Sequence, residues 1–259
     1  MTRRALIGHT GFVGGNLAAQ APFDDGYNSR NIEEIAGKRY DLVVCAGAPA
    51  VKWKANQEPE ADRAAIARLE SALGAAAIAE LVLVSTVDVY PAPVGVDEST
   101  RIDPAAGQPY GRHRLGLERF LAGRFKTTIV RLPGLFGPGL KKNVIYDFLH
   151  GNAVDRIDAA SVFQFYDLAD LWKDIEKVRG ARLDVCNFAT EPTSVATVAK
   201  AAFGLDFAGK GPGAPAHYDF RTRHAALWGR TDGRIRGAAE VLAALRDFVR
   251  AERERIART

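Results

Sequence analysis

Residues 4–14 read RALIGHTGFVG, an apolar stretch that runs directly into a loop with three glycines and then into an amphipathic helical pattern. A GxxGxxG pattern between a strand and a helix has a physical use. Gly8 permits the tight turn, Gly11 lets the backbone approach a pyrophosphate, and Gly14 allows the helix to pack closely on the strand. The helix start adds free amides and the positive end of its dipole, so this loop predicts a dinucleotide site. The expected contacts are Gly8, Thr10, Gly11, Phe12, Val13 and Gly14.

Apolar runs alternate with helical patterns along the chain, which is typical of a parallel sheet with crossover helices. We expect strands at Arg4–Ile7, near Tyr27, and at Tyr40–Cys45, Leu81–Ser85, Thr127–Arg131, Ser161–Tyr166 and Leu183–Phe188. We expect helices at Phe12–Ala19, Ile32–Ala36, Pro59–Ala79, Pro109–Ala122, Val144–Leu149, Leu168–Val178, Val195–Phe203 and Ala238–Ala257. The predicted fold is α/β, a Rossmann-type doubly wound parallel sheet with a small C-terminal substrate lobe. Residues 1–259 are expected to form a single NAD(P)-binding domain, with a cofactor half to about residue 133 and a mixed substrate lobe and last strands in 134–259.

Composition limits the function classes. The chain has 259 residues, of which 47% are hydrophobic, enough to bury a substantial core. It contains no run near the roughly 18 apolar residues of a membrane span and no signal-peptide pattern, so we expect a cytoplasmic protein without a membrane partner. Cys45 and Cys186 lie in apolar, strand-like runs, which predicts buried thiols and no metal site. The net charge of +4 owes much to a last helix of alternating signs, which argues against a nucleic-acid partner.

The end of the second strand decides which dinucleotide is preferred. An acidic residue about 20 positions after the first glycine would bind the ribose 2′-hydroxyl of NAD. That stretch is Asn28-Ser29-Arg30, in which a hydroxyl beside a guanidinium suits a 2′-phosphate. We therefore expect NADP to be preferred, while Asp24 and Asp25 keep NAD as the alternative.

Further motifs follow the glycine loop in a fixed order. They are DLVVCAGA (41–48), STVDVY (85–90), PYGRHR (109–114), RLPGLFGP (131–138) and DLAD (167–170). Over about residues 4–190 the chain resembles the extended short-chain dehydrogenase/reductase family, the group of NAD(P)-dependent sugar-nucleotide epimerases, dehydratases and ketoreductases. The resemblance implies further cofactor contacts at Ala46, Gly47, Ala48, Ser85, Tyr110, Arg114 and Pro133.

The resemblance also implies a catalytic group. In that family a Ser or Thr after the fourth strand and a Tyr on the next long helix flank the reacting carbonyl or alcohol, and a Lys follows the Tyr by four residues. The matching positions hold Thr86, Tyr110 and Arg114, with Ser85 as the alternative hydroxyl. A four-residue helical step puts Tyr110 and Arg114 on one face, so the guanidinium is expected to lower the phenol pKa from about 10. Unlike Lys, Arg cannot release a proton.

The implied substrate contacts are less complete. Some dehydratases of the family carry two adjacent acids where this chain has Val87 and Asp88, so dehydration is disfavoured. His113 is expected to be a helix-face residue and not a base. The substrate-binding residues implied by the resemblance are Thr86, Val87, Asp88, Gly134, Asn143 and Gln164.

These observations predict an NAD(P)-dependent oxidoreductase or epimerase. It would act by hydride transfer on a carbonyl or alcohol of a sugar-like small molecule, including nucleotide-linked sugars. Arg114 in place of Lys motivates one alternative, an NADP-binding redox sensor or scaffold without turnover, and a reductase of a non-sugar carbonyl metabolite is another. A homodimer could form through the Tyr110 helix and the neighbouring helix, where Ala64, Ala67 and Leu69 suit either an interface or a core-facing stripe.

Overall fold

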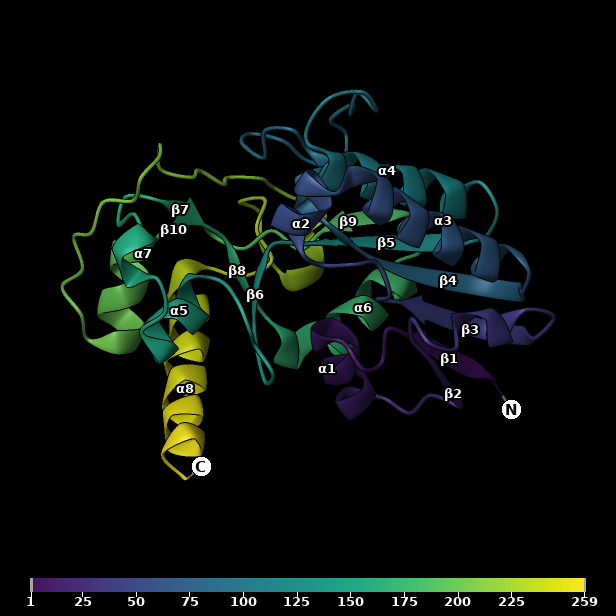
Figure 1. Ribbon diagram of the computed structural model, residues 1–259, viewed down its shortest axis with the longest axis horizontal. Coiled ribbons are helices and arrows are strands. Elements are labelled where there is room, and N and C mark those ends of the chain that lie inside the picture. Colours follow the sequence, from purple (N-terminus) through teal and green to yellow (C-terminus); the bar gives the residue numbers. More distant parts are fainter. Residues whose placement is uncertain (1, 259) are drawn as a thin grey trace. The chain divides into compact units, whose positions relative to one another are not determined.

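The computed structural model describes residues 2–258, which form two compact units (Figure 1). The first unit contains residues 2–92, Ser99–Arg131 and Leu171–Asn187, and the second contains Pro93–Glu98, Leu132–Asp170 and residues 188–258. Apart from Pro93–Glu98, the chain passes from the first unit to the second at Leu132. Leu171–Asn187 returns to the first unit, where it supplies a helix and the last strand of the main sheet.

A six-stranded sheet organises the first unit. Its strands are β1 (Arg4–Ile7), β2 (Asp25–Tyr27), β3 (Arg39–Cys45), β4 (Ala77–Thr86), β5 (Thr127–Leu132) and β9 (Val185–Asn187). They lie in the order β2-β1-β3-β4-β5-β9, and the pairings of β1 with β2 and β3, of β3 with β4 and of β5 with β9 are parallel. The predicted doubly wound α/β fold is confirmed. The order reverses between β1 and β3, and open α/β sheets bind ligands outside the carboxyl ends of their strands at such a point.

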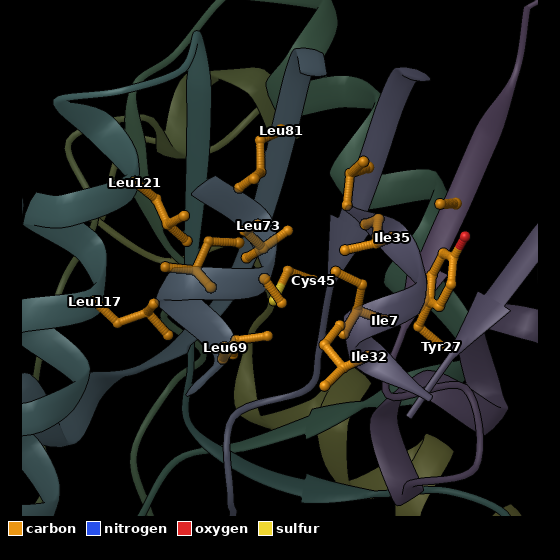
Figure 2. Close-up of a cluster of buried hydrophobic side chains, with 14 of the residues drawn as sticks. Ile7, Tyr27, Ile32, Ile35, Cys45, Leu69, Leu73, Leu81, Leu117 and Leu121 are labelled. Carbon is orange, nitrogen blue, oxygen red and sulfur yellow. The ribbon is translucent and has the colours of Figure 1, made fainter. Parts of the chain in front are cut away.

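Helices cover both faces of this sheet (Figure 1). The helical segments are α1 (Phe12–Gln20), η1 (Ile32–Ile35), α2 (Lys52–Gln57), α3 (Pro59–Gly74), η2 (Val87–Val89), α4 (Pro109–Ala122) and α6 (Leu171–Gly180). Helices α3 and α4 lie on one face, and α1 and α6 on the other. Successive strand residues point to opposite faces, so alternate strand positions meet the leucines of α3 and α4. Members of that core, shown in Figure 2, include Ile7, Cys45, Leu69, Leu73, Leu81, Leu117 and Leu121.

Two differences from the expected elements concern the region before α4. The helix from Pro59 ends at Gly74, not Ala79, because β4 already begins at Ala77 and pairs with Arg39 of β3. The short helix α2 was not expected, since its sequence KWKANQ has no apolar periodicity. Three residues of this helix suited either a dimer interface or a core-facing stripe. Leu69 is buried in the core, while Ala64 and Ala67 are exposed.

The second unit has two small sheets. Strand β6 (Gly134–Phe136) pairs in parallel with β8 (Phe165–Asp167), and β7 (Val162–Phe163) pairs antiparallel with β10 (Thr193–Ser194). Its helical segments are α5 (Val144–His150), η3 (Val154–Arg156), η4 (Leu168–Asp170), α7 (Val195–Val198), η5 (Ala199–Phe203), η6 (Ala225–Trp228) and α8 (Ala238–Ala257). The single strand expected over Ser161–Tyr166 was wrong. Gln164 separates β7 from β8 because its buried side-chain amide bonds the backbone of Phe220.

Two expectations from composition concern membrane-spanning helices and the two cysteines. Within residues 2–258 no helix is long and apolar enough to cross a membrane. Cys45 and Cys186 are free and buried, as expected, and burial raises the pKa of the Cys45 thiol to about 11.

Candidate active site

The glycine turn is packed too tightly for side chains at two of its three glycines. Gly8 has a φ of +85°, and its N–H donates to the Tyr27 carbonyl at 2.7 Å. A Cβ on Gly8 would overlap the Ala46 carbonyl oxygen, and a Cβ on Gly14 would overlap the Gly8 carbonyl oxygen. Strand β1, its loop and α1 are therefore held at a distance that only glycine permits.

Gly11 differs from its two neighbours because the space beside it is open. A Cβ on Gly11 would meet only one heavy atom within 4 Å, the Gly8 carbonyl oxygen at 3.2 Å. Gly11 caps α1 without a side-chain hydrogen bond, and the first turn of α1 contains no acidic residue. Phe12 and Val13 are half-buried and Thr10 is exposed. An uncapped helix start beside open space fits a dinucleotide pyrophosphate, because its amides and dipole favour an anion.

His9 ties this loop to the end of β2. Its Nδ1 lies 3.0 Å from the Tyr27 carbonyl oxygen, and a Cβ on Gly26 would come within 3.1 Å of the imidazole ring. The ring thus packs on the backbone of β2, so the imidazole positions the loop.

The loop after β3 meets the glycine turn at the point where the strand order reverses. The Ala46 N–H donates to the Ile7 carbonyl at 2.9 Å, and a Cβ on Gly47 would lie 2.7 Å from the Ile7 side chain. Ala46, Gly47 and Ala48 are all half-buried. The structure therefore brings two of these expected cofactor contacts, Ala46 and Gly47, against the loop that contains Gly8.

The segment after β2 forms a compact polar turn. The Asn28 side chain accepts from the Arg30 N–H at 2.8 Å, and the Ser29 carbonyl accepts from Arg68 at 2.8 Å. Both Ser29 and Arg30 have exposed side chains. The turn leaves the Arg30 guanidinium at the carboxyl end of β2, the end at which the first βα loops bind a dinucleotide.

The two acids considered for NAD lie at the other end of β2. Asp24 accepts from the Arg4 N–H at 2.7 Å, and the Asp25 carboxylate accepts from Arg3 at 2.8 Å. Asp25 pairs with Ala5 at the amino end of β1. A strand rises about 3.3 Å per residue, so the length of the strand separates these carboxylates from the glycine turn.

Thr86 and Tyr110 come together although they belong to different elements. Thr86 ends β4 and Tyr110 is the second residue of α4, and the Thr86 hydroxyl lies near enough to the phenol to lower its pKa. The first turn of α4 rests directly on η2, because a Cβ on Gly111 would overlap the Asp88 carbonyl oxygen. Thr86 also accepts from the Asp88 N–H at 3.1 Å, while Val87 is 2% exposed. Of the residues expected near Tyr110, the structure therefore places Thr86 and Asp88 beside it and buries Val87.

Arg114 packs against Tyr110, but its charge is paired with the carboxylate of Asp62. The guanidinium carbon lies 4.0 Å from the centre of the Tyr110 ring. Its terminal nitrogens donate to both carboxylate oxygens of Asp62 and to the Pro49 carbonyl, and the side chain is 3% exposed. Within residues 2–258 the Nε of Arg114 has no hydrogen-bond partner. His113, on the same helix, also contacts Asp62, at 2.7 Å.

The pKa of Tyr110 differs from the sequence-based expectation. Burial raises the pKa of this phenol above its usual value. Arg114 acts in the expected direction and lowers the pKa, as do Lys52 and the Thr86 hydroxyl, while Asp88 raises it. Burial outweighs the guanidinium, so the expectation of a lowered pKa was wrong. At neutral pH Tyr110 holds its proton.

Ser85 belongs to a buried network of polar side chains and not to the pair formed by Thr86 and Tyr110. Its hydroxyl donates to Glu118 at 2.5 Å, and Glu118 pairs with Arg131 at 2.6 Å. Glu118 and Arg131 have almost fully buried side chains. Between the two hydroxyls considered from the sequence, Thr86 is the one that reaches Tyr110.

Four expected contacts lie in the second unit: Pro133, Gly134, Asn143 and Gln164. Asn143 caps α5 by accepting from Ile145 N–H at 3.0 Å and donates to the Leu135 carbonyl at 2.8 Å. Gly134 packs against the Gln164 carbonyl, which a Cβ would approach to 3.0 Å. The side-chain amides of Asn143 and Gln164 are therefore engaged with the backbone of their own unit.

Three side chains near Tyr110 were not anticipated. The Lys52 ammonium lies 2.8 Å from Asp88 Oδ1, the Asn56 side chain accepts from the Tyr110 N–H at 3.0 Å, and Asp62 neutralises Arg114. They lie on α2 and α3. No motif marks them, because each meets its partner across at least 36 positions of sequence.

The profile of the NAD dependent epimerase/dehydratase family matches residues 23–157. No functionally curated protein matches the sequence. Solved structures with this fold include MoeE5 in complex with UDP-glucuronic acid and NAD, which is 20% identical with a TM-score of 0.72 over 96% of this chain and 99% of that one.

Two further solved structures share the fold. The UDP-N-acetylglucosamine 4-epimerase from Methanobrevibacter ruminantium M1, in complex with UDP-N-acetylmuramic acid, is 15% identical with a TM-score of 0.76 over 100% of this chain and 99% of that one. The dTDP-4-dehydrorhamnose reductase from Bacillus anthracis str. Ames, in complex with NADP, is 19% identical with a TM-score of 0.73 over 97% and 99%. At these identities the likeness establishes the fold.

Proposed function

Because this chain belongs to the NAD dependent epimerase/dehydratase family, we propose that it is an NADP-dependent reductase of a carbonyl group on a nucleotide-linked sugar. The observation that carries the proposal is the pair of hydroxyls of Thr86 and Tyr110, with Tyr110 holding its proton. One solved structure of the same fold is a complex with UDP-glucuronic acid and NAD, and another is a dTDP-4-dehydrorhamnose reductase in complex with NADP. These complexes support the substrate class.

Tyr110 and Thr86 would have different roles in a carbonyl reduction. Tyr110 would donate its proton to the substrate oxygen as charge develops there, and Thr86 would hold that oxygen by a hydrogen bond. A bound dinucleotide supplies the hydride. A phenol that keeps its proton at neutral pH suits the reducing direction, in which the substrate oxygen must gain a proton.

The dinucleotide would lie across the carboxyl ends of β1, β2 and β3. Gly11 and the start of α1 would receive the pyrophosphate, and Ala46, Gly47 and Ala48 would lie beside the riboses. Arg30, with Ser29, would bind a 2′-phosphate, and both acids considered for NAD are engaged at the other end of β2. This arrangement favours NADP over NAD.

Cofactor binding can be tested before the substrate is known. We expect Gly11→Ala to raise the Kd for NADPH by about tenfold or more while the protein stays folded, because the added methyl meets only the Gly8 carbonyl oxygen, at 3.2 Å, and otherwise extends into the space proposed for phosphate. Gly116→Ala is the matched control, since a Cβ there would meet no atom within 4 Å. Equal affinity of both variants and the unaltered protein, measured by NADPH fluorescence, would contradict the proposed site.

Turnover is then tested with UDP- and dTDP-linked 4-keto sugars, following NADPH oxidation. Tyr110→Phe should lower kcat by about 10²–10⁴-fold and leave NADPH affinity nearly unchanged, because it removes only the proton donor. NAD that copurifies with the protein would instead indicate an epimerase, which retains its cofactor. Turnover confined to simple aldehydes or ketones would indicate a non-sugar reductase. NADPH binding without turnover, with Tyr110→Phe indistinguishable in every assay, would indicate a sensor.

A further inference from the structure

The short helix α2 is fastened to the turn that contains Tyr110. The Asn56 side chain accepts from the Tyr110 N–H at 3.0 Å, and the Pro49 carbonyl, just before α2, accepts from Arg114. The third attachment is the Lys52 ammonium, which lies 2.8 Å from Asp88 Oδ1. These three contacts along eight residues hold α2, and with it the backbone of Lys52, beside the turn that contains Tyr110.

Arg114 cannot respond to a change of charge on Tyr110. Its guanidinium is buried, its terminal nitrogens are shared between Asp62 and Pro49, and Asp62 compensates its charge. An arginine also stays protonated at all accessible pH values. This cation therefore provides a constant field and a surface for the ring.

Lys52 has the opposite properties. Its side chain is 44% exposed, and an ammonium on a flexible stem can move and can exchange protons with water. Its partner Asp88 lies under the first turn of α4, where the Asp88 carbonyl excludes any side chain at Gly111. The charged groups that act on the phenol are thus Arg114 from α4, Asp88 from η2 and Lys52 from α2.

We propose that Lys52, anchored on Asp88, is a positioning residue that stabilises Tyr110 after the phenol has given up its proton. The inference rests on the proposed role of Tyr110 as proton donor. When the phenol becomes a phenolate, the Lys52 ammonium offsets the new negative charge, which Asp88 alone would oppose. The opposite signs of Lys52 and Asp88 make the proposal testable without a substrate.

The test places 3,5-difluorotyrosine at position 110 and follows its ionisation by 19F NMR in the full chain. This phenol releases its proton at lower pH than tyrosine, and the fluorine signal reports a single site among the seven tyrosines. We expect Lys52→Gln to raise the titration midpoint by at least about half a pH unit, about a threefold change in proton affinity. Asp88→Asn should lower it, and the double variant should fall between the two.

Two controls separate charge from structure. Lys52→Arg should keep the original midpoint, because the cation remains. Lys54→Gln should also leave it unchanged, because Lys54 lies on the same helix with a side chain 57% exposed and pairs with Glu58 at 3.8 Å.

The proposal is overturned if Lys52→Gln matches Lys54→Gln, or if Lys52→Gln and Asp88→Asn move the midpoint in the same direction. If a Lys52 variant fails to fold, Asp88→Asn alone must still lower the midpoint. The titration needs neither NADPH nor a sugar, so its failure is distinct from a failure of the proposed reductase activity, which is measured by turnover.

Discussion

The guanidinium of Arg114 stacks on the Tyr110 ring at 4.0 Å while both of its terminal nitrogens donate to Asp62. The stacking follows from the four-residue helical step between the two residues. The pairing with Asp62 joins α4 to α3. The cation that the sequence predicts to lie in the active site therefore also joins the helix of Tyr110 to its neighbour α3.

Removing the Asp62 carboxylate should strongly destabilise the first unit. Asp62→Ala leaves the Arg114 charge buried and uncompensated, and we expect a loss of about 3–5 kcal/mol in the free energy of unfolding. Urea unfolding followed by circular dichroism measures it. Glu58→Ala is the control, because the Lys54–Glu58 pair is exposed and should contribute less than about 1 kcal/mol. Similar losses in both variants would show that Asp62 is not compensating a buried charge.

The contribution of Asp62 should depend on pH with a definite sign. Burial would raise the pKa of this carboxyl, but the hydrogen bonds from Arg114 and His113 outweigh burial and lower it. A group with a lowered folded pKa stabilises the protein above its unfolded pKa, about 3.9, and loses that effect as pH falls through the folded pKa. The difference in unfolding free energy between the unaltered protein and Asp62→Asn should be constant from pH 7 to about 5 and shrink below about pH 4. A difference that grows on acidification would contradict this assignment.

Gly14→Ala should act on folding, unlike Gly11→Ala. The added methyl on Gly14 would overlap the Gly8 carbonyl oxygen, so α1 must move away from β1. We expect a loss of about 1–3 kcal/mol in the free energy of unfolding, as for overpacked cores, together with weaker NADPH binding. Thermal unfolding of both variants checks the contrast. If Gly14→Ala were as stable as Gly116→Ala, the close packing of the turn would be refuted.

Arg30→Ala should change cofactor preference without changing stability. The loss of a guanidinium–phosphate contact should raise the Kd for NADPH by about 10- to 100-fold and leave the Kd for NADH unchanged. Arg39→Ala is the control, because Arg39 is exposed at the amino end of β3, away from the dinucleotide end of the sheet. Equal effects on NADPH and NADH would remove Arg30 from the 2′-phosphate site.

Removing the adjacent hydroxyls of Ser85 and Thr86 should have different effects, the first on stability and the second on catalysis. Ser85→Ala removes a bond to the buried Glu118 carboxylate, and we expect a loss of about 1.5–3 kcal/mol in unfolding free energy with NADPH turnover retained. Thr86→Ala should lower kcat, by about tenfold or more if its bond to the substrate oxygen strengthens in the transition state. The reverse pattern would assign the substrate hydroxyl to Ser85.

The element pattern could be predicted well wherever the signal is local. The bounds of β1, α4 and α8 match the expected ranges, because a strand reads as an uninterrupted apolar run and a helix as a periodic one. Prediction failed at α2, which is too short and polar to show a period, and at Gln164, where a buried amide interrupts a run of strand formers. At Gln164, contacts with the distant backbone of Phe220 override the local preference.

The sequence by itself determined the glycine turn, the alternation of strands and helices along the chain and the one-turn spacing of Tyr110 and Arg114, because each shows in a local pattern. Only the tertiary structure decided that Asp62 compensates Arg114, that Lys52 meets Asp88 and that Tyr110 keeps its proton. The physical reason is that charge pairing and desolvation depend on which surfaces pack together, and packing joins residues that no local pattern connects.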